Sequence, residues 1–159
     1  MTGGGSSIHE IQRLLAVLAV GRRVAEAGTA FGDGGDGTNC EERRHGRARP
    51  RRAAIAARRL EGLPNVELLL GDWRELLPPR GRFELLFLDA GGFKHAPGDG
   101  DQLVLGLLEP GGLLVLDDLT PDWPGFDPVR NWAHGHSDLE VVEVLTTPVT
   151  SALLIAKPS

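Results

Sequence analysis

The sequence has one cysteine, Cys40, which excludes an internal disulfide and a cysteine-based metal cluster. It also lacks any apolar run near the ~20 residues that a membrane-spanning helix needs. Positive charge is not in excess: the formal net charge is −5, so the molecule as a whole is not built to coat nucleic acid or an anionic membrane. The first residues have neither the charged start nor the cleavage pattern of a signal peptide, and we expect a cytoplasmic protein.

The sequence contains enough apolar material for one domain. Of its 159 residues, 41% are hydrophobic and 25% are charged, as in an ordinary globular protein. A chain of this length can bury a core of useful size. We therefore expect a single domain over residues 1–159, with a flexible Gly/Ser-rich N-terminus at residues 1–7.

Short apolar runs alternate with helical patterns along most of the chain. Apolar residues at helical spacing predict helices over residues 8–20, 51–60, 73–77, 101–108 and 128–134. Strands are predicted over residues 23–27, 66–70, 83–88, 113–116, 139–145 and 152–157. This alternation predicts an α/β three-layer sandwich around a mostly parallel sheet. The last two strands have no helix between them, which predicts an antiparallel C-terminal strand.

Glycines and carboxylates follow four successive predicted strands. Ligands of open α/β sheets bind at the carboxyl ends of the strands, so these positions are the first candidates for a site. One such residue alone is more often a helix cap or a turn former, but four strand ends in a row indicate a ligand site. The residues in question are Glu26, Gly28, Gly32, Asp72, Asp89, Asp117 and Asp118.

Four segments carry a family resemblance: VAEAGTAFG, LPNVELLLGDW, FELLFLDAGGFKH and LEPGGLLVLDDLT. In this order they resemble class I S-adenosylmethionine (SAM)-dependent methyltransferases, most closely the bacterial O-methyltransferases related to catechol O-methyltransferase. The resemblance covers most of residues 14–157, excepting residues 33–50, and implies a Rossmann-like fold. The first turn is not G-x-G-x-x-G, which disfavours a dinucleotide-dependent dehydrogenase.

The resemblance implies a binding site for SAM as cofactor. Residues around the first turn match the positions near its methionine part, and Asp72 with Trp73 matches the position near adenine. Asp89 belongs to the cofactor site as well. The implied cofactor-binding residues are Glu26, Gly28, Thr29, Gly32, Asp72, Trp73 and Asp89.

The resemblance also implies a divalent metal ion. Asp89, Asp117 and Asp118 match the metal triad of the family, in which the last position is usually Asn. Three oxygen ligands suit Mg²⁺ or a similar cation. The metal would lower the pKa of the acceptor hydroxyl, and Lys94 or His95 would take its proton. Lys94 follows Asp89 by five residues, whereas the family usually places its lysine three residues after the first Asp.

The acceptor is less well defined by the sequence. The resemblance implies a small molecule with a hydroxyl group, and family members are often homodimers. Asp122, Trp123 and Trp132 follow the metal position, and two interpretations are open: they line a pocket for an aromatic acceptor, or the tryptophans pack the edge of the core. The packing interpretation is favoured for Trp132.

Residues 33–50 interrupt the family pattern. The segment DGGDGTNCEERRHGRARP has four glycines and no apolar periodicity, so it is predicted as loop or disorder. In the implied fold, a helix and a second strand that ends in a ribose-binding acid belong here. We therefore expect both elements to be missing or disordered, and SAM binding to be weak or absent.

Eight of the 17 basic residues lie between Arg43 and Arg59. Clustered arginines can neutralise phosphates, so a nucleic-acid-binding loop is one interpretation. We disfavour it, because the cluster lacks interleaved aromatics and the protein is acidic. In that case the binding residues would include Arg43, Arg44, Arg47 and Arg49.

A different hypothesis for this segment comes from the genetic code. Residues 44–50, RHGRARP, can be encoded as CGT CAC GGT CGA GCT CGA CCN. Dropping the first base gives Val-Thr-Val-Glu-Leu-Asp, a strand that ends in an acid. The same shift over residues 32–43 permits an Ala-rich helix. Both missing elements emerge in the right order, so we hypothesise compensating frame changes near Gly32 and near Pro50.

Overall fold

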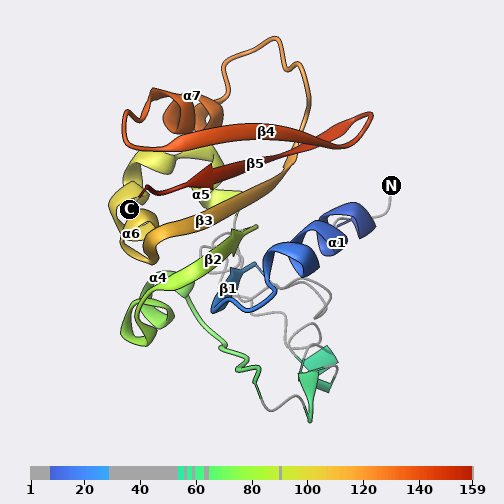
Figure 1. The fold of residues 1–159 in the computed structure, drawn as a ribbon, viewed down its shortest axis with the longest axis vertical. Helices are drawn as coiled ribbons and strands as arrows, with labels where there is room; N and C mark the ends of the chain where they lie inside the picture. Colours follow the sequence, from blue (N-terminus) through green and yellow to red (C-terminus); the bar gives the residue numbers. More distant parts are fainter. Residues whose placement is uncertain are drawn as a thin grey trace.

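The computed structural model describes residues 8–28, 54–55, 57–58, 60–62, 65–89 and 91–158. Within them, one mixed sheet has the strand order β1-β2-β3-β5-β4 (Figure 1). β1 pairs with β2 and β2 with β3 in parallel, whereas β5 is antiparallel to both β3 and β4. This confirms the predicted α/β fold. The strands are β1 (Val24–Ala27), β2 (Phe83–Leu88), β3 (Leu108–Leu119), β4 (Glu140–Thr147) and β5 (Thr150–Ala156).

The helices connect the strands and cover the sheet. The longer helices are α1 (His9–Leu18) and α7 (Pro128–Gly135). α7 begins where the Asp127 carboxylate accepts hydrogen bonds from the backbone N–H groups of Val129 and Arg130, and Pro128 suits the first helical position. The shorter helices are α4 (Trp73–Leu76), η1 (Pro78–Arg80), α5 (Gly91–His95), η2 (Pro97–Asp99) and α6 (Asp101–Gly106).

β2 separates two hydrophobic layers because successive side chains of a strand point to opposite faces. Leu85 and Phe87 pack on one face with Ile11 of α1. Leu86 and Leu88 pack on the other face, in a cluster whose helical members come from α4, α5, α6 and α7. Both faces of this strand are therefore buried, which explains its nearly continuous apolar sequence.

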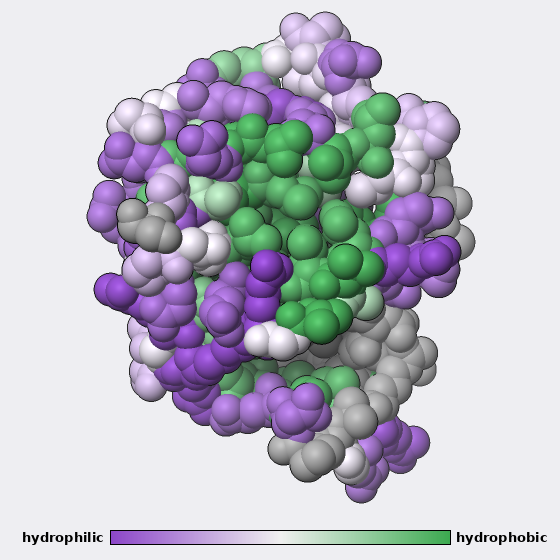
Figure 2. Space-filling model, in the orientation of Figure 1, coloured by the Kyte–Doolittle hydropathy of each residue, from purple (hydrophilic) through white to green (hydrophobic). Residues whose placement is uncertain are grey.

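The first of these faces is only partly covered. Figure 2 shows apolar side chains gathered over α1 and the β3-β5-β4 part of the sheet. Exposed apolar residues of this region include Val17 and Val20 near the end of α1 and Val142 on β4, which shares its face with Val144 of the cluster around Ile11. In the part of the chain that the structure describes, no helix is long and apolar enough to span a membrane.

The predicted strand at residues 66–70 is wrong, because these residues have no regular secondary structure and are not part of the sheet. Val66 is 42% and Leu70 is 63% exposed. A strand needs a neighbour for its backbone groups, and β1 is the edge strand of the described sheet. The run pairs neither with the free side of β1 nor with another described strand, so it does not extend the sheet. The predictions for residues 1–7 and 33–50 lie outside the described residues.

β3 is longer than predicted. It begins at Leu108, which pairs with Phe83 of β2, so helix α6 ends at Gly106 and not at residue 108. Residues 109–112, which lie between the predicted helix and the predicted strand, form an irregular part of β3, where its pairing with β2 shifts register. A Cβ on Gly112 would lie 2.8 Å from the Glu109 carbonyl oxygen and 3.1 Å from that of Phe83, which explains the glycine.

Candidate functional site

The carboxyl ends of β1, β2 and β3 meet at one edge of the sheet, as expected for parallel strands. Asp89 directly follows β2, and its backbone N–H donates to the Ala27 carbonyl across 2.8 Å. This bond brings Asp89 beside Gly28, the residue after β1. Gly28 has φ +119°, a conformation that side chains disfavour. Ligands of this type of sheet bind at such an edge.

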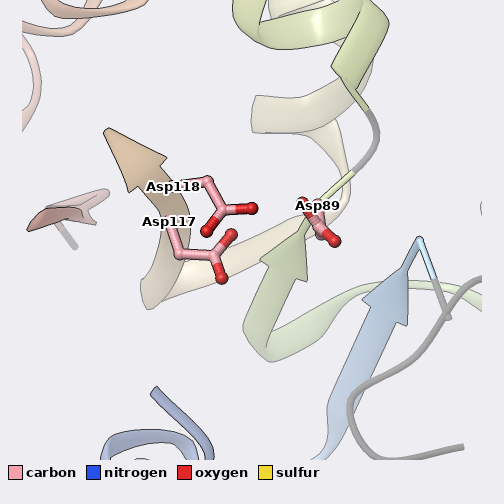
Figure 3. A group of neighbouring side chains, drawn as sticks. All are labelled: Asp89, Asp117 and Asp118. Carbon is pink, nitrogen blue, oxygen red and sulfur yellow. The ribbon is translucent and has the colours of Figure 1, made fainter. Parts of the chain in front are cut away.

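Asp89, Asp117 and Asp118 form an acidic cluster at the same edge (Figure 3). One carboxylate oxygen from each lies within 4.8 Å of the others. Successive residues of a regular strand point to opposite faces, so Asp117 and Asp118 would not ordinarily converge. Asp118 has φ +57°, and the pairing of β3 with β5 shifts register between Leu116 and Leu119. This irregularity breaks the alternation and allows both carboxylates to face Asp89.

The ammonium group of Lys94 lies against this cluster. It donates hydrogen bonds to Asp89 Oδ1 at 3.1 Å, to Asp117 Oδ1 at 3.2 Å and to the Asp117 backbone carbonyl at 2.7 Å. These three acceptors match the three hydrogens that an ammonium group can donate. The Lys94 side chain is only 12% exposed, so its charge is shielded from water by the protein around it.

The charges of the cluster shift its pKa values. Burial raises the pKa of Asp117 to about 6, although Lys94 acts in the opposite direction. Burial likewise raises the pKa of Asp89. For Lys94, burial disfavours the charged form, but the charges of Asp117 and Asp89 outweigh it and raise the pKa. Three carboxyl groups face one ammonium, so Lys94 stays protonated and one buried acid gives up its proton less readily.

The acidic cluster offers the hard oxygen donors that Mg²⁺ prefers. Two of the three carboxylates, however, already accept hydrogen bonds from Lys94. A divalent cation and this ammonium would compete for the same oxygen atoms of Asp89 and Asp117. With Lys94 in this position, the residues do not fit a divalent cation.

Among the described residues, the other implied cofactor residues come from β1 and from the start of α4. Glu26 lies within β1, and Trp73 is buried at the start of α4. Asp72 precedes α4 and accepts a hydrogen bond from the Arg74 backbone N–H at 3.0 Å, so it acts as a helix cap. Thr29 and Gly32 lie outside the described residues.

Four further candidates lie in α5, in α7 and between β3 and α7. His95 is exposed at the last position of this helix, beside Lys94. Trp132 packs edge-on against Phe93 with ring centroids 5.2 Å apart, which supports the packing interpretation for this tryptophan. Trp123 is 54% exposed, and Asp122 is exposed with φ +51°.

The structure adds one residue that the sequence analysis did not single out. Arg130 of α7 donates two hydrogen bonds to Glu143 of β4, at 2.8 and 2.6 Å, and binds Asp127 and the Thr120 carbonyl. It therefore ties α7 and β4 to the chain just after β3. The only sequence signal was the spacing of Asp127 and Arg130, which suits a helical ion pair.

A cavity of about 710 Å³ lies between β1 and the chain that leads into α4. Its walls include Val24 and Glu26 of β1, Val66 and Leu69 of the segment predicted as a strand, and Trp73. The cavity therefore borders the edge of the described sheet and reaches two implied cofactor residues, Glu26 and Trp73.

No family model matches this sequence, and no match was found among curated proteins. Several solved structures do match. A methyltransferase from Geobacter sulfurreducens is 21% identical with a TM-score of 0.70, covering 97% of this chain and 82% of its own. An O-methyltransferase from Bacillus cereus in complex with SAH is 16% identical with a TM-score of 0.63, and the match covers 98% of this chain and 84% of the Bacillus chain. An O-methyltransferase from Streptomyces achromogenes in complex with SAM is 22% identical with a TM-score of 0.55, and the match covers 94% of this chain and 79% of the Streptomyces chain.

These similarities extend over nearly the whole chain. They show that it has the Rossmann-like fold of SAM-dependent O-methyltransferases, with parallel N-terminal strands and antiparallel C-terminal strands. The resemblance noted in the sequence is confirmed at this level.

Proposed function

We propose that the protein transfers a methyl group from SAM to a hydroxyl oxygen of a small molecule. The observation that carries the proposal is the hydrogen bond between Asp89 and Ala27, because it sets the glycine turn after β1 beside the acidic cluster. The structural similarity to O-methyltransferases, two of them in complex with SAM or SAH, supports the same reaction.

The cofactor would bind at the turn after β1 and in the adjoining cavity. Gly28, with its positive φ, allows the turn after β1 to pass close to a ligand, and Glu26 and Trp73 face the adjoining cavity. When bound, SAM would supply its methyl group as an electrophile. The contribution of the protein would be to hold the acceptor oxygen in line with that group, since positioning accounts for much of the catalysis in such transfers.

The acceptor hydroxyl must lose a proton. Lys94 already donates three hydrogen bonds and its pKa is raised, so it is poorly suited to accept one. We therefore propose His95 as the base, and Lys94 as a positive charge beside the acceptor oxygen. An aromatic acceptor could contact the exposed Trp123. In this proposal no metal ion takes part in the transfer, because the Lys94 ammonium already occupies the carboxylates of Asp89 and Asp117.

SAM binding is the first test of this proposal. Thermal unfolding of the purified chain with and without SAM should show an increase in melting temperature, since a ligand stabilises the state that binds it. Gly28→Ala should remove the increase. Gly135→Ala is the matched control, because an added Cβ there meets no atom within 4 Å, and it should keep the increase. Methyl transfer from SAM to a panel of phenols and catechols would then test the reaction, and a loss of activity in His95→Gln would support the base.

A second candidate is a methyltransferase-like protein with an impaired cofactor site. The specific observation in its favour is that, among the residues the structure describes, β1 is the edge strand, with the cavity beside it and residues 66–70 outside the sheet. In this case calorimetric titration with SAM would show weak or no binding by the chain as it stands. Tight binding would overturn the candidate and favour the active enzyme.

A further inference from the structure

Lys94 lies where a cation is needed most. The acidic cluster brings three carboxylates together, one of them on the almost fully buried Asp117. Carboxylates this close repel one another and are costly to bury without a positive charge. In the structure that charge is the Lys94 ammonium, which contacts both Asp89 and Asp117.

The position of Lys94 is held by more than charge. Its shortest hydrogen bond, at 2.7 Å, goes to the backbone carbonyl of Asp117 and so ties the ammonium to the end of β3. The preceding residue, Phe93, is almost fully buried and packs against Trp132 of α7. These contacts fix α5 and aim Lys94 at the cluster.

We propose that the Lys94 ammonium is the resident cation of the acidic cluster and holds Asp89 and Asp117 together in place of a divalent metal ion. A metal ion can then bind only if Lys94 leaves. It follows that the unaltered protein has little affinity for divalent cations, and that removing the charge of Lys94 exposes a cation site made of Asp89, Asp117 and Asp118.

Binding of Mn²⁺ tests this inference without SAM or acceptor, so its outcome does not depend on the proposed reaction. The affinity would be measured by electron paramagnetic resonance for the unaltered protein and for Lys94→Met. Lys157→Met is the matched control, since Lys157 is the second of two lysines and donates to the Leu105 carbonyl. We expect Lys94→Met to bind Mn²⁺ at least about tenfold more tightly than the other two proteins, because two carboxylates lose their positive partner.

Two further variants connect the gain to the cluster. Lys94→Arg keeps the charge and should bind Mn²⁺ as weakly as the unaltered protein. Adding Asp117→Asn to Lys94→Met should abolish the gain. Equal Mn²⁺ affinity of the unaltered protein and Lys94→Met, whether strong or weak, would overturn the inference. If Lys94→Met does not fold alone, it would be refolded with Mn²⁺: recovery of the fold supports the inference, and failure overturns it.

Discussion

The ring of Trp132 meets the ring of Phe93 edge-on, with centroids 5.2 Å apart and an interplanar angle of 86°. Through this contact, α7 supports the short helix α5, and with it the position of Lys94. A helix of five residues has little stability of its own, so packing must hold it in place.

Replacing Phe93 with alanine should therefore weaken both the fold and the site. We expect a loss of about 3 kcal/mol in the free energy of unfolding, measured by urea denaturation, because a buried aromatic side chain is removed. Trp123→Ala is the control: this side chain is 54% exposed, and its removal should cost no more than about 0.5 kcal/mol. Similar losses for both variants would contradict the packing role of Phe93.

Asp117 should make the stability depend on pH. Its pKa rises from an ordinary 3.8 to about 6 on folding, since burial disfavours the charged form. A carboxyl group whose pKa is raised by folding favours the folded state when protonated. Its contribution is therefore fully present below pH 3.8 and lost as the pH rises to about 6.

The measurement compares the unaltered protein with Asp117→Asn, which cannot titrate at this position. Relative to the variant, the free energy of unfolding of the unaltered protein should fall by roughly 3 kcal/mol across this window and then level off. A difference that stays constant between pH 4 and pH 7 would show that Asp117 does not titrate as expected.

Gly112 should tolerate no side chain. In Gly112→Ala the new Cβ would stand 2.8 Å from the Glu109 carbonyl oxygen, a backbone atom that cannot move aside cheaply. We expect a loss of roughly 1–3 kcal/mol in stability, seen as a lower melting temperature. Gly106→Ala, whose Cβ would meet no atom within 4 Å, should leave the melting temperature unchanged or slightly raised. Equal effects of the two substitutions would refute the close approach.

The frame hypothesis for residues 33–50 predicts a gain of function on repair. A chain in which these residues are translated in the shifted frame should melt at a higher temperature and bind SAM more tightly, because a strand beside β1 and a ribose-binding acid would be restored. A chain with a Gly/Ser linker of equal length in their place is the control and should show neither gain. Sequencing the gene provides a separate check: codons whose shifted translation is not strand-like would end the hypothesis.

The sequence was sufficient to predict those helices and strands whose formation depends on the local pattern of apolar residues. The run FELLFL predicts β2 with its observed bounds, because a strand buried on both faces leaves an unbroken apolar signature. The run VELLL carries the same kind of pattern and does not form a strand. Whether this run forms a strand depends on a pairing partner elsewhere in the chain, and the local apolar pattern carries no information about that partner. The early start of β3 has the same origin, because Leu108 pairs with Phe83.

For the candidate site, too, the sequence predicted one part and not another. Parallel topology alone brings Asp89 and Asp117 to one edge, and this followed from counting strands. The position of the Lys94 ammonium group against these carboxylates could not be predicted, because spacing along the sequence does not show which way a side chain on a short helix points. The links from Arg130 to Glu143 and Thr120 were also hidden, since they join an α-helix to two distant segments.

The scarcity of lysine gives the acidic cluster its own chemical reporter. Amine-reactive reagents attack an accessible, unprotonated amine, and Lys94 is enclosed, triply hydrogen-bonded and raised in pKa. Acylation should therefore reach Lys157 long before Lys94, and since these are the two lysines of the chain, peptide masses after proteolytic digestion assign the acyl group to one or the other. The rate at which Lys94 is acylated then measures how often the carboxylates release it, in the free protein or with a ligand bound.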